Sequence, residues 1–251
     1  MTSSSNERRG HGPGPATRKQ VRRAAAVVVA AMTSGCFALF ELDGYGPAEP
    51  VDEAGAMDAA ADAADAARDA GPPPKVVFVT SQLFAIAEEN GITTDPAVAH
   101  GHCNALARDA GLTGEYKAWI SKEGSSPSTE FEALTSDGGD RYPLVTTNGM
   151  LIASSYAQLA DSGPRAPIAV TETRQSLADA AAEEGCESPF VVWSATDGAG
   201  KHVEGRDCAS WRTRATQAPG RVGRLVAAPE EWTSACDLPC SRMARLYCFQ
   251  Q

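Results

Sequence analysis

The chain has 251 residues, of which 43% are hydrophobic, and a formal net charge of −10 at pH 7. This composition is ordinary for a soluble globular protein with one core of moderate size. Because an acidic chain repels phosphate backbones, the charge excludes nucleic acid as an expected partner. The charge is unevenly distributed: residues 1–35 carry +5, residues 36–74 carry −8 and residues 75–251 carry −7.

The first 35 residues have the three-part layout of a bacterial signal peptide. A basic region that ends at Arg22-Arg23 precedes the apolar stretch 24–32, and small residues then lead to Cys36. The segment Thr33-Ser34-Gly35-Cys36 resembles a lipobox, whose cysteine is acylated, for example with palmitate, and becomes the mature N-terminus. Thr33 stands where such motifs usually have leucine.

Acylation of Cys36 predicts a lipoprotein held to a membrane by its lipid anchor, which two or more acyl chains make stable. Phe37 is not the Asp that commonly retains lipoproteins in the inner membrane, so the resemblance implies the outer membrane or cell surface. Two alternatives stay open. A plain cleaved signal gives a secreted or periplasmic protein, and the 17 uncharged residues 24–40 are at the lower limit for an uncleaved membrane span.

Residues 36–74 are predicted to form a disordered tether between the anchor and a folded domain. They are rich in Ala, Asp and Pro, poor in aromatic residues, and end at Gly71-Pro72-Pro73-Pro74. Such a segment buries too little apolar area to offset the entropy lost on ordering. We expect it to hold residues 75–251 clear of a membrane surface.

The predicted domain, residues 75–251, opens with the apolar run 75–80, which is typical of a strand. Asp95 followed by Pro96 is typical of a helix N-terminus, and Gly111 of a helix end. We expect one face of this helix to lie against the core, formed by Ala99, Cys103, Leu106 and Ala110.

The remaining predicted elements are short. They are a strand at 116–120, a hairpin of 143–145 and 150–152 with an Asn148-Gly149 turn, a helix at 155–160, a strand at 190–193, a loop-rich stretch at 197–223 and a last strand at 245–249. One helix followed by many short strands and long loops favours an α+β fold over an alternating parallel sheet.

Six cysteines remain once Cys36 is set aside, and an even number in an exported domain predicts three disulfides. These six are Cys103, Cys186, Cys208, Cys236, Cys240 and Cys248. Six cysteines allow 15 pairings, among which the sequence cannot choose. The rival interpretation is a metal site built on Cys236 and Cys240, but their spacing is not that of a zinc ribbon, so no metal is expected.

Several segments together resemble a bacterial domain family of uncharacterised function that occurs in secreted proteins and lipoproteins. They are VVFVTS (76–81), DPAVAHGHCNALARDAGL (95–112), YKAWIS (116–121), PLVTTNGMLIASSYAQLADSG (143–163), VVWSATDGAG (191–200), CASW (208–211) and RLYCFQQ (245–251). That family is related to the C-type-lectin-like and endostatin folds. The resemblance covers nearly all of residues 75–251.

This resemblance implies a lectin-like fold with long disulfide-linked loops, in which the termini lie together. A bridge from the first helix to the last strand then implies Cys103–Cys248, and a bridge before the last strand implies Cys208–Cys240. The remaining pair is Cys186–Cys236. The resemblance also implies binding or adhesion through the loops between Asp197 and Trp232. The partner would be a glycan or an envelope or extracellular protein.

Candidate ligand residues are few. The Glu-Pro-Asn, Gln-Pro-Asp and Trp-Asn-Asp tripeptides of calcium-dependent lectins are absent, so calcium-mediated sugar binding is not expected. The acidic segment Asp137–Asp140 could hold a hard cation through oxygen ligands, but it is interpreted as a plain turn. Trp211 and Trp232 are the candidates for a ligand-facing aromatic surface, whereas Trp193 is expected in the core.

We expect no enzyme and no cofactor. The sequence has no GxSxG motif, Asp197–Lys201 lacks the Walker spacing, and His100 and His102 lie two apart, on different faces of a helix. The leading hypothesis is a tethered, non-enzymatic binding domain. The alternatives are a purely structural envelope protein and a hydrolase or oxidase on the same scaffold.

Overall fold

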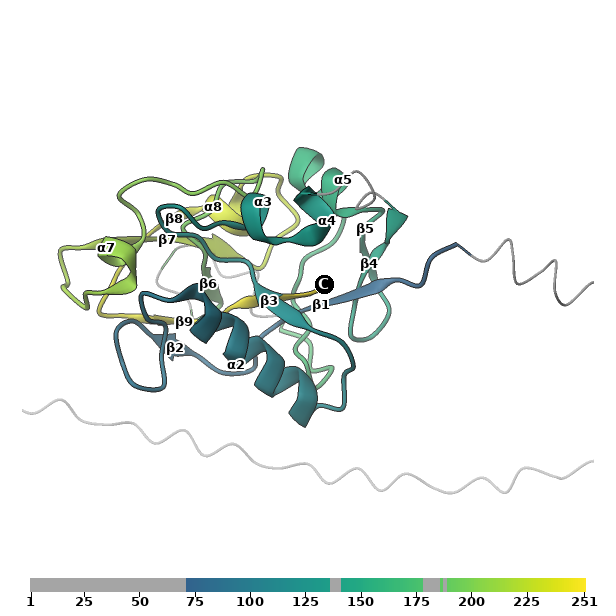
Figure 1. Cartoon of the computed structure of the whole chain (residues 1–251), viewed down its shortest axis with the longest axis horizontal. Helices are drawn as coiled ribbons and strands as arrows, with labels where there is room; N and C mark the ends of the chain where they lie inside the picture. Colours follow the sequence, from purple (N-terminus) through teal and green to yellow (C-terminus); the bar gives the residue numbers. More distant parts are fainter. Residues whose placement is uncertain (1–70, 136–140, 178–185, 187–188) are drawn as a thin grey trace, which may run out of the picture. The chain divides into compact units, whose positions relative to one another are not determined.

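The computed structural model describes residues 71–135, 141–177, 186 and 189–251 (Figure 1). The predicted signal peptide, Cys36, the tether up to residue 70 and the acidic turn Asp137–Asp140 lie outside the described residues. Among the helices within the described ranges, none is both long and apolar enough to cross a membrane.

A five-stranded mixed sheet forms the centre of the fold, with strand order β3-β10-β1-β4-β5. The strands are β1 (Lys75–Val79), β3 (Tyr116–Ala118), β4 (Leu144–Thr146), β5 (Leu151–Ala153) and β10 (Tyr247–Gln250). The first of them, β1, pairs antiparallel with the last, β10, and parallel with β4. The two ends of the domain therefore lie side by side in the middle of the sheet (Figure 1).

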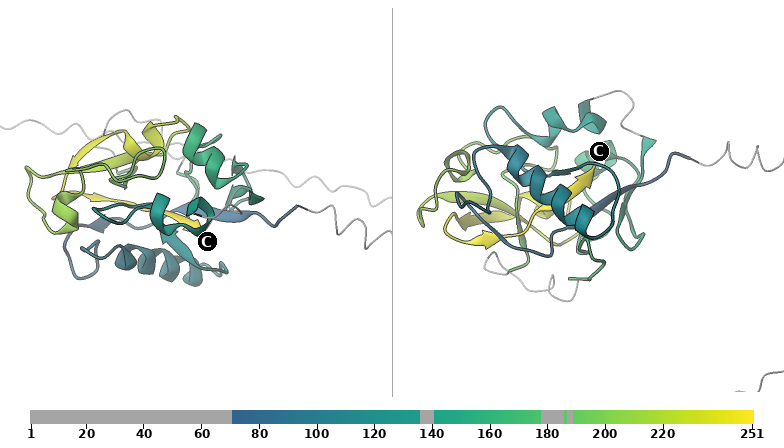
Figure 2. Two further views of the ribbon diagram at one scale, coloured as in Figure 1. Left: turned by 45° about the horizontal axis from the view of Figure 1, so that its top comes forward. Right: turned by 60° about the horizontal axis from the view of Figure 1, so that its bottom comes forward.

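Both faces of this sheet are covered, which explains why its central strands are apolar at successive positions. Side chains alternate between the two faces, so Phe78 and Cys248 belong to one core cluster and Val77 and Phe249 to the other. Helix α2 (Pro96–Asp109) packs in the first cluster and helix α5 (Tyr156–Ser162) in the second. Figure 2 shows these two helices on opposite sides of the sheet.

The start of α2 follows its sequence signals, but its buried face differs from the prediction. Asp95 caps the helix, with its Oδ1 accepting the backbone N–H of Ala97 at 3.0 Å, and Pro96 occupies the first turn, as predicted. The buried residues are Pro96, Ala99, Cys103 and Ala107. Leu106 and Ala110, which the prediction placed in the core, are only half-buried, because the buried stripe steps by four from Ala99 and leaves them at its edge.

Two smaller antiparallel sheets and four short helices complete the described chain. Strands β6 (Val191–Trp193), β7 (Pro219–Arg224) and β8 (Cys236–Pro239) form one sheet, and β2 (Phe84–Ala85) with β9 (Met243–Ala244) the other. The helices are α3 (Pro127–Glu130), α4 (Glu132–Thr135), α7 (Cys208–Trp211) and α8 (Glu231–Ser234). The Asn148-Gly149 hairpin, the helix after Ser155 and the strand that ends at Trp193 are confirmed.

Strand β7 lies partly within the stretch predicted to be loop, and its glycines explain the error. A Cβ atom on Gly220 would lie 2.6 Å from the Trp193 ring and 2.7 Å from the sulfur of Cys208. Glycine is therefore required at position 220 because an indole and a disulfide lie too close to the strand for a side chain, and not because the chain turns.

Three disulfides join Cys103 to Cys248, Cys186 to Cys236 and Cys208 to Cys240. They are the pairs that the family resemblance implies. The first ties α2 to the last strand across a sequence separation of 145 residues. The α+β class, with short helices, mixed and antiparallel sheets and three disulfides, is thus confirmed.

Candidate functional site

The two tryptophans predicted to face a ligand lie in the core, so that prediction is wrong. Trp211 is 1% exposed and Trp232 is 0% exposed. The Trp211 indole donates to the carbonyl of Ser121 at 3.0 Å, and the Trp232 ring packs on Trp119 with centroids 4.9 Å apart. Neither ring offers a face to a ligand from solvent. Trp193 is 0% exposed, which confirms its expected place in the core.

The backbone around Trp211 explains how a residue in a glycine-rich stretch becomes buried. Four successive residues, Cys208 to Trp211, have φ values of 54°, 55°, 56° and 61°, so α7 is a single left-handed turn. Asp207 stabilises it, because its Oδ1 accepts the backbone N–H of Ser210 at 3.0 Å and its Oδ2 lies 3.1 Å from Nε2 of His202. The Cys208–Cys240 disulfide anchors the start of the turn. This geometry directs the indole of Trp211 inward.

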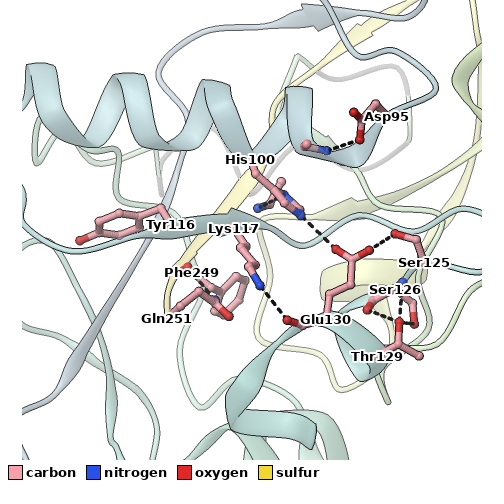
Figure 3. Close-up of polar contacts among 12 residues, drawn as sticks. Asp95, His100, Tyr116, Lys117, Ser125, Ser126, Thr129, Glu130, Phe249 and Gln251 are labelled. Atoms are coloured by element: carbon pink, nitrogen blue, oxygen red, sulfur yellow. Dashed lines mark hydrogen bonds and ion pairs between the residues drawn. The ribbon is translucent and has the colours of Figure 1, made fainter.

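A cluster of polar side chains joins α2 to α3 and to the loop before α3 (Figure 3). Nε2 of His100 lies 3.1 Å from a carboxylate oxygen of Glu130, and the hydroxyl of Ser125 donates to the other oxygen. On the far side of the imidazole, Nδ1 of His100 accepts the backbone N–H of Ala118 at 3.0 Å. Lys117 donates to the backbone carbonyl of Glu130 at 2.7 Å.

This cluster is structural in its hydrogen bonding and does not form a nucleophilic triad. In a Ser-His triad a histidine nitrogen accepts the proton of the serine, whereas Ser125 donates to Glu130 and both nitrogens of His100 have other partners. Because Nδ1 is an acceptor, the imidazole is neutral and donates from Nε2. Burial lowers the pKa of His100, and the hydrogen bond to Glu130 only partly opposes that shift.

His100 and His102 contact different groups. Nε2 of His102 lies 3.1 Å from the carbonyl oxygen of Gly91, away from Glu130. Within the part of the chain that the structure describes, no group of three or more His, Cys, Asp and Glu side chains is arranged to hold a metal ion.

The candidate binding site is a groove of about 440 Å³ where α5, the turn after Asp197 and α8 meet. We call it the acidic groove. Its charged lining residues are Asp161, Asp197 and Glu230, and Ser234 adds a hydroxyl. Among its described lining residues there is no basic and no aromatic side chain.

Close backbone packing around Pro229 builds the acidic groove. Gly163 ends α5 with φ +72°, and a Cβ atom there would lie 2.5 Å from the Cα of Pro229. A Cβ atom on Gly198 would lie 3.3 Å from the carbonyl oxygen of Pro229. Two glycines thus allow the α5 end and the Asp197 turn to approach the same proline, and this approach brings Asp161 and Asp197 to one groove.

The Asp197 turn is itself well ordered by hydrogen bonds. Its backbone N–H donates to the carbonyl of Lys201 at 2.9 Å, and its Oδ1 accepts the N–H of Lys201 at 2.8 Å. Half-buried Asp197 and exposed Asp161 and Glu230 create a negative field. Such a site attracts cationic groups and accepts hydrogen bonds from hydroxyl groups.

The loops between Asp197 and Trp232, through which the resemblance implies binding, include Asp197 and Glu230 of the acidic groove, whereas Asp161 lies outside them. Asp197 begins those loops and is also part of an incomplete Walker motif. Asp161 and Glu230 carried no signal, because residues this far apart in sequence are brought together only by packing against Pro229.

No family model matches the chain, and no curated protein matches it.

Proposed function

We propose that the chain is a cell-envelope lipoprotein that displays a non-enzymatic binding or adhesion domain of C-type-lectin-like architecture. The observation that carries this proposal is the acidic groove, which is lined by Asp161, Asp197 and Glu230. Its carboxylates suit recognition of a ligand rich in hydroxyl or amino groups, such as a glycan.

The arrangement of the chain ends supports the lectin-like part of the proposal. The pairing of β1 with β10 and the Cys103–Cys248 bridge from first helix to last strand are features that the family resemblance leads us to expect. The Cys208–Cys240 bridge secures the left-handed turn within the long loops. Fold alone does not establish function, so the weight of the proposal rests on the groove.

The hydrogen-bonding pattern supports a binding role over catalysis. The His100–Glu130–Ser125 cluster is the arrangement nearest to a catalytic one, and its groups are already committed to one another and to the backbone. A site that binds without reacting needs only acceptors of fixed position, which the ordered Asp197 turn supplies.

A glycan array probed with the full chain, with and without calcium, tests the proposal. We expect binding that Asp197→Asn with Glu230→Gln weakens by about tenfold or more, because hydrogen bonds to charged groups contribute about 1.5–3 kcal/mol. Asn keeps the Oδ1 that accepts the Lys201 N–H, so the turn is retained. The control is Glu204→Gln, which removes a negative charge from an exposed side chain outside the groove.

The binding proposal fails if no glycan or envelope polymer is retained by the full chain. Equal retention by the doubly uncharged variant and the Glu204→Gln control would instead reject the acidic groove as the site.

A further inference from the structure

A second groove, of about 420 Å³, lies where the described chain enters the domain. We call it the entry groove. It is lined by the start of β1 with the prolines before it, the loop after α2, Tyr116 of β3, Tyr142 and Gln250 of β10. The entry groove shares no lining residue with the acidic groove.

The hydroxyl of Tyr116 is a buried donor without an acceptor in the entry groove. Tyr116 is 0% exposed, and its hydroxyl has no hydrogen-bond partner among the described residues. Figure 3 shows its ring directed away from the Lys117–Glu130 contacts. Burial raises the pKa of Tyr116 to about 12, so the hydroxyl keeps its proton at neutral pH.

An unpaired buried hydroxyl destabilises the protein unless something accepts its hydrogen bond. The neighbouring side-chain amide of Gln250 cannot accept this hydrogen bond, because its oxygen and its nitrogen both have other partners. Oε1 of Gln250 accepts the N–H of Val76 at 2.8 Å, and Nε2 donates to the carbonyl of Thr113 at 3.1 Å. No described residue therefore accepts a hydrogen bond from the Tyr116 hydroxyl.

Lys75 gives the entry groove a positive charge. Its ammonium lies 5.0 Å from the centre of the Tyr142 ring and is the only charged group among the described lining residues. Desolvation lowers the pKa of Lys75 by more than the nearby negative charge of Glu132 raises it. This cation belongs to a domain whose residues 75–251 carry a net charge of −7.

We propose that the entry groove binds an acidic sugar unit, a uronate, with its carboxylate on Lys75 and a second oxygen accepting from the Tyr116 hydroxyl. The groove has the volume of a small-ligand site. Tyr142 and the prolines at 73–74 offer apolar surface to the sugar ring. A plain apolar carboxylate would engage Lys75 alone, whereas a sugar also carries the oxygen that Tyr116 lacks. This proposal does not rest on the acidic groove.

Titration of the full chain with glucuronate by calorimetry or NMR tests the entry groove, with glucose and cyclohexanecarboxylate as comparison ligands. We expect Tyr116→Phe to weaken glucuronate binding about tenfold, the loss of one hydrogen bond. Lys75→Met should weaken glucuronate to the level of glucose, and Lys122→Met, at a lysine outside the groove, should change nothing. Cyclohexanecarboxylate should bind more weakly than glucuronate and be insensitive to Tyr116→Phe.

Absence of glucuronate binding, or binding equal to that of glucose, overturns the proposal. So does a Tyr116→Phe variant that keeps full affinity and loses stability, since a buried water would then be the partner of the hydroxyl. The Asp197→Asn, Glu230→Gln protein should still bind glucuronate, so the entry groove and the acidic groove fail or succeed separately.

Discussion

Ala209 is the residue whose substitution most directly tests the left-handed turn at Cys208–Trp211. With φ 55° and an exposed side chain, Ala209 lies in a conformation that L residues rarely adopt. We predict that Ala209→Gly stabilises the protein, the reverse of the usual effect of glycine.

The magnitude follows from two opposing contributions. An L residue in the left-handed helical region costs about 1–2 kcal/mol, which glycine avoids. Glycine loses about 0.5–1 kcal/mol more than alanine in backbone entropy on folding. Because the exposed Ala209 methyl contributes little packing, we expect a net gain of about 0.5–1 kcal/mol in the free energy of unfolding.

Ala105, near the middle of the right-handed helix α2, provides the matched control. There the same substitution should cost about 1 kcal/mol. Urea unfolding with the disulfides intact, followed by the fluorescence of the buried tryptophans, measures both variants. For a domain of this size each kcal/mol corresponds to about 2–4 °C in melting temperature, so the two variants should move in opposite directions by resolvable amounts.

If Ala209→Gly destabilises as much as Ala105→Gly, the turn is not left-handed in solution. The account of how Trp211 reaches the core would then be refuted.

Three other predictions follow from the bridges, the buried histidine and the anchor. Replacing Cys103 and Cys248 together by Ala should lower the free energy of unfolding by about 5 kcal/mol in the chain-entropy model, because the bridge closes 145 residues; calorimetry of both forms measures this. Burial lowers the pKa of His100, so the unfolded state binds more protons than the folded state as pH falls through about 6.5. The free energy of unfolding should therefore fall from about pH 7 to about pH 5.5, and His100→Gln should make this pH dependence smaller in urea titrations. Cys36→Ala should abolish incorporation of labelled palmitate and release the protein from membranes; retained label would refute acylation at Cys36.

The elements anticipated from sequence are those with signals carried by a few adjacent residues. The Asp95 side chain accepts from an N–H two residues away, and the Asn148-Gly149 turn joins two strands that are neighbours in sequence. The apolar residues of β1 indicate directly that this strand is buried. Each of these depends on local hydrogen bonding or on the periodicity of side chains. Neither needs knowledge of the rest of the fold.

Burial and juxtaposition across the chain were decided only by tertiary structure. Trp211 and Trp232 lie in loop-rich sequence, yet packing with Ser121 and Trp119 removes them from solvent. The acidic groove exists because the chain near Asp161 and Asp197 approaches one proline, and the entry groove because Tyr116 and Lys75 face the same hollow. The sequence around a tryptophan, an acidic residue or a tyrosine does not tell whether its side chain lies in the core or lines a groove. That depends on which distant atoms exclude water from the side chain.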